Sequence, residues 1–194
     1  LGCVYYYTLT SGHHPFGEAL HRQSNILSHT FTLNFNLPSA FDCEYEKILA
    51  LELIADMLKQ QSRPTCDAVL KHPLFWSDSK MLDFMQVISD RVERLDTSDD
   101  PLWSLERNAR LIVRDDWKVV LEEEIVNDLG KQRTYHGGSV RDLMRAIRNK
   151  RNHYNELTEE VKRLLGAIPI DYCKFWLTRF PHLPSHAYHV MQMC

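Results

Sequence analysis

Apolar side chains recur three and four positions apart along most of this chain, and alternation at every second position is scarce. A spacing of three and four returns side chains to one face of an α-helix, whereas a half-buried strand needs a period of two. Five apolar side chains between positions 82 and 95 share one helical face: Leu82, Met85, Ile88, Val92 and Leu95. The pattern therefore predicts an all-α protein.

Capping residues and prolines predict where further helices begin and end. Asp100-Pro101 is typical of an N-cap followed by proline at the first helical position. The buried stripe of that helix would be Leu102, Leu105, Ala109 and Ile112. Thr158 and Gly166 bracket a short helix as its start and stop. Pro169 and Pro184 are each expected to open a later helix.

The composition changes near positions 77–80, which predicts a boundary. A smaller piece, 1–78, is rich in His, Pro and Ser, and a helical domain, 79–194, follows it. A length of 194 residues suits one domain or two small ones with a buried core. No stretch reaches the roughly 18 apolar residues of a membrane helix. Because the chain opens on LGCVYYYTL without Met, we expect a soluble piece of a larger protein.

The cysteines and histidines give little reason to expect a metal. The five cysteines are scattered and never form a CxxC pair, which argues against a zinc site and favours a reducing compartment. His182, His186 and His189 have helical spacing, but Pro184 lies among them and no Cys or carboxylate partner is evident. We therefore expect no metal ligands.

Charge is unevenly distributed along the chain. The net charge of −3 gives no reason to expect a polyanionic partner. However, positions 83–128 hold 13 acidic and 6 basic residues, whereas positions 131–154 hold 7 basic residues and 1 acidic residue. A dense basic segment is typical of phosphate binding, although a solvated helix face can have the same composition.

The basic segment also carries signals for a helix. Gly137-Gly138 provides a flexible turn, and Ser139-x-x-Asp142 matches a capping box at a helix start. The apolar stripe that would anchor the helix is Val140, Leu143, Met144 and Ile147. This segment is therefore predicted to be an amphipathic helix with a basic exposed side.

Polar side chains on another side of that helix suit RNA cleavage. Arg145, Asn149 and His153 fall at i, i+4 and i+8, and Tyr135 lies in the loop before the helix. Attack by a ribose 2′-hydroxyl needs a base, an acid and positive charge at the phosphate, and histidine titrates nearest neutrality. Tyr135 could accept a proton or stack on a base. The pattern alone leaves open a surface histidine that only forms a hydrogen bond.

A family resemblance favours the catalytic interpretation. RTYHGGSVRDLMRAIRNKRNHYNEL, Arg133–Leu157, closely resembles the kinase-extension nuclease domain of the inositol-requiring-enzyme family of endoplasmic-reticulum stress sensors, and more distantly RNase L. LGAIP and RFPHL, at 165–169 and 179–183, are similar to later helices of that domain. The resemblance identifies 79–194 as the nuclease domain.

The first 78 residues resemble part of a protein-kinase C-lobe. LGCVYYYTLTSGHHPFG is similar to its large helix, and RPTCDAVLKHPLFW to its last helix and closing segment. The first of these is apolar on nearly all sides, which predicts burial. No Gly-rich loop, ATP-positioning Lys, catalytic-loop Asp or DFG motif is present, so this chain is not expected to phosphorylate. ATP or ADP and Mg would belong to the remaining kinase half of the parent protein.

The resemblance implies a metal-independent endoribonuclease that needs no cofactor and cuts RNA stem-loops. The products would be a 2′,3′-cyclic phosphate and a 5′-hydroxyl, in mRNA splicing and mRNA decay of the unfolded protein response. His153 would be the general acid and Tyr135 the general base, while Arg148 binds phosphate and Asn149 orients the substrate. The substrate-binding residues would be Lys150, Arg145, Arg151 and Asn152.

The resemblance also predicts partners and a location. The parent protein would form a homodimer or higher oligomer through both domains at the cytosolic face of the endoplasmic reticulum. This piece would make no membrane contact. An alternative of another class is a noncatalytic helical module that only dimerises or docks RNA.

Overall fold

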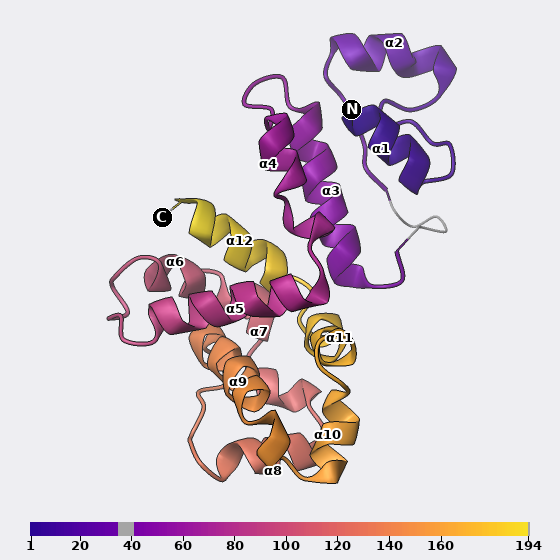
Figure 1. Ribbon diagram of the computed structural model, residues 1–194. Helices are drawn as coiled ribbons and strands as arrows, with labels where there is room; N and C mark the ends of the chain where they lie inside the picture. The colour runs from indigo at the N-terminus through magenta and orange to yellow at the C-terminus, as the bar shows by residue number, and fades with distance from the viewer. Residues whose placement is uncertain (35–40, 194) are drawn as a thin grey trace. The chain divides into compact units, whose positions relative to one another are not determined.

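The computed structural model describes residues 1–34 and 41–193, and every regular element in these ranges is a helix (Figure 1). The prediction of an all-α protein is therefore confirmed. The chain forms two compact units, Leu1–Phe75 (unit 1) and Trp76–Cys194 (unit 2). Among the described residues, no helix combines the length and apolar character needed to cross a bilayer.

Unit 1 is built around two packed helices. Its elements are α1 (Gly2–Leu9), α2 (Ala19–Leu27), α3 (Glu44–Leu58), α4 (Cys66–Leu70) and the 3-10 helix η1 (Pro73–Phe75). One face of α1 packs against α3, where Tyr6, Ala50 and Ile54 are buried. Val4 and Tyr7 of α1 are more than half exposed. The prediction that this helix is buried on nearly all sides is therefore wrong within unit 1, because α3 covers one face of it.

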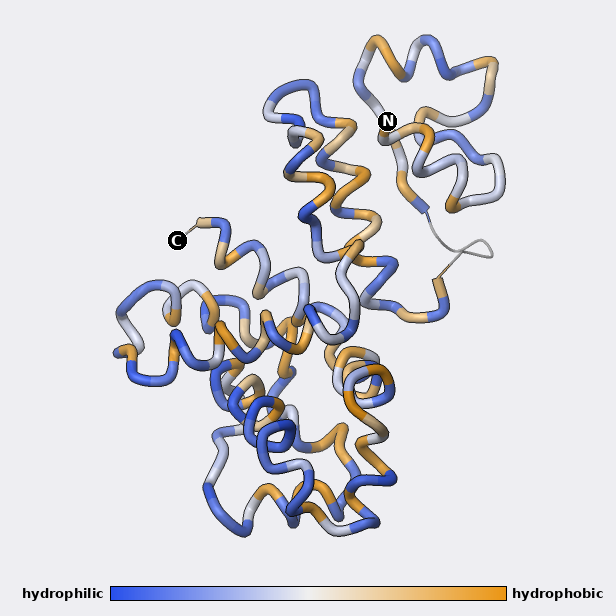
Figure 2. The backbone as a smooth tube through the Cα atoms, in the orientation of Figure 1, coloured by the Kyte–Doolittle hydropathy of each residue, from blue (hydrophilic) through white to orange (hydrophobic). Residues whose placement is uncertain are grey.

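Unit 2 is built around two long helices, α5 and α9. Its elements are α5 (Asp78–Val92), α6 (Leu102–Glu106), α7 (Ala109–Val113), η2 (Trp117–Val120), α8 (Glu123–Gly130), α9 (Val140–Asn152), η3 (Tyr154–Glu156), α10 (Glu159–Leu165), α11 (Ile170–Arg179) and α12 (Leu183–Met193). Helix α9 packs against α5, α6 and α7, while α5 also contacts α11 and α12. The colours in Figure 2 change repeatedly along α5 and α9, as expected for helices with one buried face.

The apolar stripes predicted from the sequence lie in the core of unit 2. Four of the five side chains predicted on the face of α5 are buried, but Leu95 lies beyond its end at Val92. The helix predicted from Asp100-Pro101 is interrupted, because Asn108, with φ −116° and ψ 28°, separates α6 from α7. The side chain of Asp100 still accepts a hydrogen bond from the Ser104 amide at 3.3 Å.

The later helices begin near the residues predicted to open them. The Thr158 hydroxyl accepts from the Val161 amide, and Gly166 ends α10 with φ at 74°. Pro169 is the N-cap of α11, and Pro184 lies in the first turn of α12. These helix starts are confirmed.

Leu143 of α9 provides a test of this core, because its side chain is 0% exposed. We expect Leu143→Ala to lower the free energy of unfolding by about 2–5 kcal/mol, since it leaves a cavity where a leucine was packed. Urea denaturation followed by circular dichroism measures the loss. Leu111→Ala, at a position that is 63% exposed, is the control and should stay within about 0.5 kcal/mol of wild type. Equal losses would contradict this packing.

Candidate active site

Two oxygen-bearing side chains cap the start of α9. The Ser139 hydroxyl accepts from the Asp142 amide at 3.2 Å, as the sequence predicts. Glu106 of α6 adds a carboxylate that accepts from the Val140 amide at 3.0 Å and the Arg141 amide at 2.9 Å. Its negative charge lies at the positive end of the helix dipole. The start of α9 is therefore held by α6 as well as by its own cap.

The loop before α9, which carries Tyr135, is bound by η2. The Trp117 amide donates to the Gly137 carbonyl at 3.0 Å, and Lys118 Nζ donates to the Tyr135 carbonyl at 3.2 Å. The Tyr135 and Trp117 rings meet edge to face, with centroids 6.0 Å apart. A Cβ on Gly137 would lie 2.1 Å from Asp116 Oδ1, so this close approach requires glycine. The backbone that carries Tyr135 is thereby fixed.

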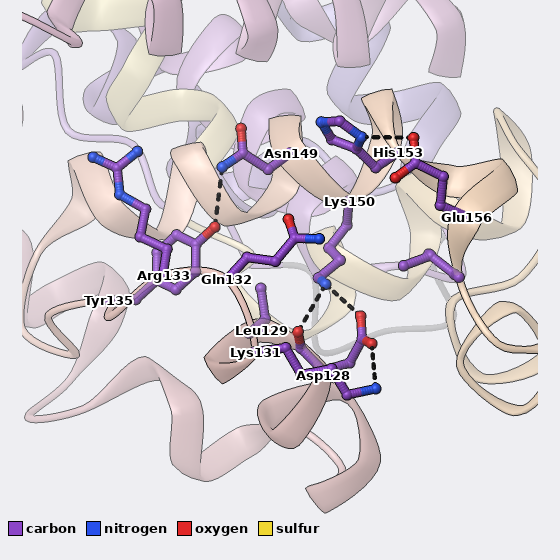
Figure 3. A pocket seen from close by; sticks show the side chains of 11 residues that line it. Asp128, Leu129, Lys131, Gln132, Arg133, Tyr135, Asn149, Lys150, His153 and Glu156 are labelled. Carbon is purple, nitrogen blue, oxygen red and sulfur yellow. Dashed lines mark hydrogen bonds and ion pairs between the residues drawn. The ribbon is translucent and has the colours of Figure 1, made fainter.

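A cavity of about 240 Å³ lies where the end of α8, the Tyr135 loop and the end of α9 meet (Figure 3). Its lining includes Asp128, Arg133, Tyr135, Asn149, Lys150 and His153. The structure thus brings three of the four predicted catalytic residues into one cavity, together with the predicted substrate-binding Lys150. Arg148 does not line it.

Tyr135, Asn149 and Arg148 form a continuous hydrogen-bonded chain. Asn149 Nδ2 donates to the Tyr135 hydroxyl oxygen at 3.0 Å, as Figure 3 shows. Behind it, Nε and Nη2 of Arg148 both donate to Asn149 Oδ1 at 3.2 Å. Two donors of one guanidinium thus share a single acceptor, which holds Asn149 Oδ1 toward Arg148 while Nδ2 reaches Tyr135. Arg148 therefore acts on the cavity through Asn149 and not by direct contact.

His153 ends α9, and its ring meets a carboxylate one turn further on. His153 Nδ1 lies 2.9 Å from Glu156 Oε1, and the histidine side chain is 56% exposed. Because an ionised carboxylate only accepts hydrogen bonds, this contact places a proton on Nδ1. In this tautomer Nε2 carries the ring's lone pair.

Lys150 is paired with a buried aspartate at the end of α8. Lys150 Nζ donates to the Asp128 carboxylate and, at 3.2 Å, to its backbone carbonyl. Lys131 Nζ donates to the same carboxylate at 3.0 Å. Burial alone would raise the pKa of Asp128, but the hydrogen bonds and charges of the two lysines hold it below its usual value. Asp128 therefore stays ionised between two cations.

Glu93, just beyond α5, forms ion pairs with three arginines. Its carboxylate lies 2.8 Å from Arg145 Nε, 3.2 Å from Arg148 Nη2 and 3.5 Å from Arg133 Nη1. Burial would raise the pKa of Glu93, but the hydrogen bond from Arg145 and the three positive charges hold that pKa below its usual value. The end of α5 is thereby tied to α9 and to the Tyr135 loop.

Three predicted substrate-binding residues lie away from the cavity. Arg145 is buried and donates to Asp142 Oδ1 at 2.5 Å as well as to Glu93, so it is a structural ion-pair residue, contrary to the prediction. Arg151 Nη2 faces α5 and donates to Asp83 Oδ1 at 2.6 Å. Asn152 is exposed and outside the cavity lining. Helical periodicity places Arg145 on the same side of α9 as Asn149, but it could not show the acidic partners of Arg145.

Sequence reasoning missed four carboxylates: Glu93, Glu106, Asp128 and Glu156. Glu156 had a usable signal, because three residues after His153 is one turn away. The other three lie in or next to other helices and are brought to α9 only by tertiary packing. No spacing rule within the sequence could have selected them.

Of the three histidines with helical spacing, His186 has a contact that joins two helices. His186 Nε2 lies 2.8 Å from the Leu105 backbone carbonyl and thereby ties α12 to α6. Within residues 1–34 and 41–193, no group of three or more His, Cys, Asp or Glu side chains is arranged to hold a metal ion.

Comparison with known proteins places this chain in a family. The model of the family described as ribonuclease 2-5A matches residues 81–194. A serine/threonine-protein kinase/endoribonuclease of Caenorhabditis elegans is 43% identical over 196 residues, which cover 100% of this chain and 20% of that protein. A sensor for unfolded proteins in the ER of Schizosaccharomyces pombe is 41% identical, over 99% and 18%. The human serine/threonine-protein kinase/endoribonuclease IRE2 is 40% identical, over 100% and 21%.

The chain belongs to the ribonuclease 2-5A family. Over its whole length it is similar to kinase/endoribonucleases of the IRE1 type, which confirms the resemblance identified from the sequence. The chain spans about a fifth of the length of these relatives.

The pH dependence of stability tests the Glu93 cluster. Because the pKa of Glu93 is held below its unfolded value of 4.5, this carboxylate stabilises the fold at neutral pH. That contribution is lost as the pH falls through the folded pKa. We expect Glu93→Gln to be less stable than wild type at pH 7, with a difference that shrinks below about pH 4.5. Denaturation in guanidinium chloride at several pH values measures it.

The matched control is Glu124→Gln, an exposed carboxyl on α8. Its difference from wild type should be small and change little with pH. A loss in Glu93→Gln that stays constant from neutral to acidic pH would contradict the role of the ionised carboxylate.

Proposed function

We propose that unit 2 is the nuclease domain of a metal-independent endoribonuclease that cleaves RNA stem-loops. The ribose 2′-hydroxyl would attack the adjacent phosphate, leaving a 2′,3′-cyclic phosphate and a 5′-hydroxyl. The observation that supports this most is the convergence of Tyr135, Asn149 and His153 on one cavity beside Lys150. The printed names of the relatives, kinase/endoribonuclease, support the same activity.

Tyr135 is proposed as the base for the 2′-hydroxyl. The Asn149 amide donates to its phenolic oxygen at 3.0 Å, which would stabilise the phenolate that accepts the proton. Asn149 is itself oriented by Arg148. The guanidinium of Arg148 also pairs with Asp90 and Glu93, which keeps it behind the amide. From that position it would add positive charge near the phosphorane.

His153 is proposed as the acid for the departing 5′-oxygen. With Nδ1 held by Glu156, the proton donated to the leaving group would come from Nε2. Lys150 would contact phosphate from the cavity wall, with its ammonium already oriented by Asp128. Every step uses side chains of this chain, and no metal or cofactor takes part.

The remaining assignments concern the whole protein. We propose that residues 1–78 are part of a kinase C-lobe and that 79–194 form the nuclease domain. ATP or ADP and Mg would act in the rest of the kinase, and a homodimer or higher oligomer would align two nuclease domains. The protein would act at the cytosolic face of the endoplasmic reticulum, in mRNA splicing and mRNA decay. The similarity to a sensor for unfolded proteins in the ER supports a place in that organelle.

Loss of the proposed acid should abolish most cleavage. We expect His153→Ala to lower kcat on a labelled RNA hairpin by about 10²–10⁴-fold, because general acid catalysis supplies rate enhancements of that size. His189→Ala, an exposed histidine on α12, is the matched control and should cleave as wild type does. Full activity in His153→Ala would contradict the proposed role.

Chelation tests the absence of a metal. We expect EDTA to leave the cleavage rate and the 2′,3′-cyclic phosphate product unchanged, because Tyr135 and His153 carry both proton transfers in the proposed mechanism. Product analysis by mass spectrometry measures both. Activity lost in EDTA would contradict the mechanism. If the dimerised wild type bound the hairpin without cutting it, the noncatalytic docking module would be the better interpretation.

A further inference from the structure

Three cations line the cavity, and only Arg133 lacks a hydrogen bond among the described residues. Lys131 and Lys150 both donate to Asp128. Arg133 has a single ion pair, 3.5 Å from Glu93, and its side chain is 44% exposed. A guanidinium has five N–H donors in a fork that matches two phosphate oxygens.

Glu93 does not depend on Arg133 for its neutralisation. Arg145 and Arg148 lie closer to its carboxylate, at 2.8 Å and 3.2 Å, and their side chains are 8% and 13% exposed. Arg133 is therefore the outermost and most weakly held of the three arginines. It can leave Glu93 for another anion without exposing a buried unpaired carboxylate.

Arg133 also lies at one end of the proposed reaction centre. Figure 3 shows it beside Tyr135, with Asn149 lying between these residues and His153. In the proposed mechanism, Tyr135 contacts the nucleotide whose 2′-hydroxyl attacks, and His153 contacts the departing nucleotide. A cation beyond Tyr135, on the side away from His153, would therefore meet the backbone on the 5′ side of the attacking nucleotide.

We propose that Arg133 binds the RNA phosphate immediately 5′ of the nucleotide that attacks. This inference rests on the proposed endoribonuclease function and adds a second phosphate contact to it. On binding, the Arg133 guanidinium exchanges its 3.5 Å ion pair with Glu93 for hydrogen bonds to phosphate oxygens. The contact positions the strand and does not take part in proton transfer.

Kinetics of Arg133→Gln give the first test. We expect KM for an RNA hairpin to rise about 10-fold with kcat within about two-fold, because a phosphate contact outside the reacting atoms affects binding of ground and transition states alike. The slope of log Kd against log salt should fall by about 0.7, the value for one single-strand phosphate. Arg133→Lys keeps the charge and should keep the slope. Arg163→Gln, on the exposed side of α10, is the matched control.

A modified substrate identifies the phosphate. A methylphosphonate at the position 5′ of the attacking nucleotide removes one negative charge and should weaken binding to wild type about 10-fold. The same substitution should add no further loss in Arg133→Gln, because the contact is already absent. A methylphosphonate two positions 3′ of the cleaved bond should weaken binding to wild type and to Arg133→Gln equally.

The outcomes separate this inference from the function on which it rests. Equal losses in wild type and Arg133→Gln, or no loss in either, would overturn the phosphate contact while cleavage stands. Wild type that fails to cleave the unmodified hairpin would overturn the proposed function itself. Urea denaturation of Arg133→Gln should match wild type, and a destabilised variant would point to a structural role instead.

Discussion

The carboxylate of Glu93 joins the end of α5 to α9 through Arg145 and Arg148. Arg145 continues the connection to Asp142, whose other oxygen accepts from the His136 amide at 2.6 Å. One ion-pair network thus runs from α5 through α9 to the loop that carries Tyr135. Removing one partner from such a partly buried network leaves another charge unpaired, and this costs more than the loss of a single surface pair. The position of the loop that carries Tyr135 therefore depends in part on Glu93.

The candidate active site depends on both sides of one amphipathic helix. The apolar side of α9 is buried and fixes the rotation of the helix, so the polar side must face the cavity and α5. Arg148 and Asn149 are adjacent in sequence, and their side chains point in different directions. Asn149 reaches the cavity, and Arg148 reaches toward the α5 carboxylates and orients the amide from behind. This difference explains how Arg148, a member of the proposed catalytic set, can lie outside the cavity.

Apolar spacing and capping residues predicted the helices whose boundaries depend on neighbouring residues in the sequence. The apolar stripe of α9, the Ser139 cap and the Thr158–Gly166 helix follow from spacing and capping chemistry, and the structure contains them. The break between α6 and α7 and the end of α5 before Leu95 were missed, because the apolar stripe continues past both points. The contact of Asn149 with Tyr135 needed the loop geometry imposed by Trp117 and Gly137. That geometry depends on residues distant in sequence.

Several carboxylates of the acidic segment form ion pairs with cations of the basic segment. These pairs change what the charge distribution means. Carboxylates from 83–128 receive cations from 131–154 in the pairs Asp83–Arg151, Asp90–Arg148, Glu93–Arg145 and Asp128–Lys150. Most of the basic segment is thus committed to holding α9 in place. A count of arginines therefore overstates the positive charge that is available to a polyanion, as the buried and paired Arg145 shows. The cations that can still serve a polyanion are those with loose or shared partners at the cavity, and Arg133, 3.5 Å from a carboxylate that two other arginines already neutralise, is the foremost of them.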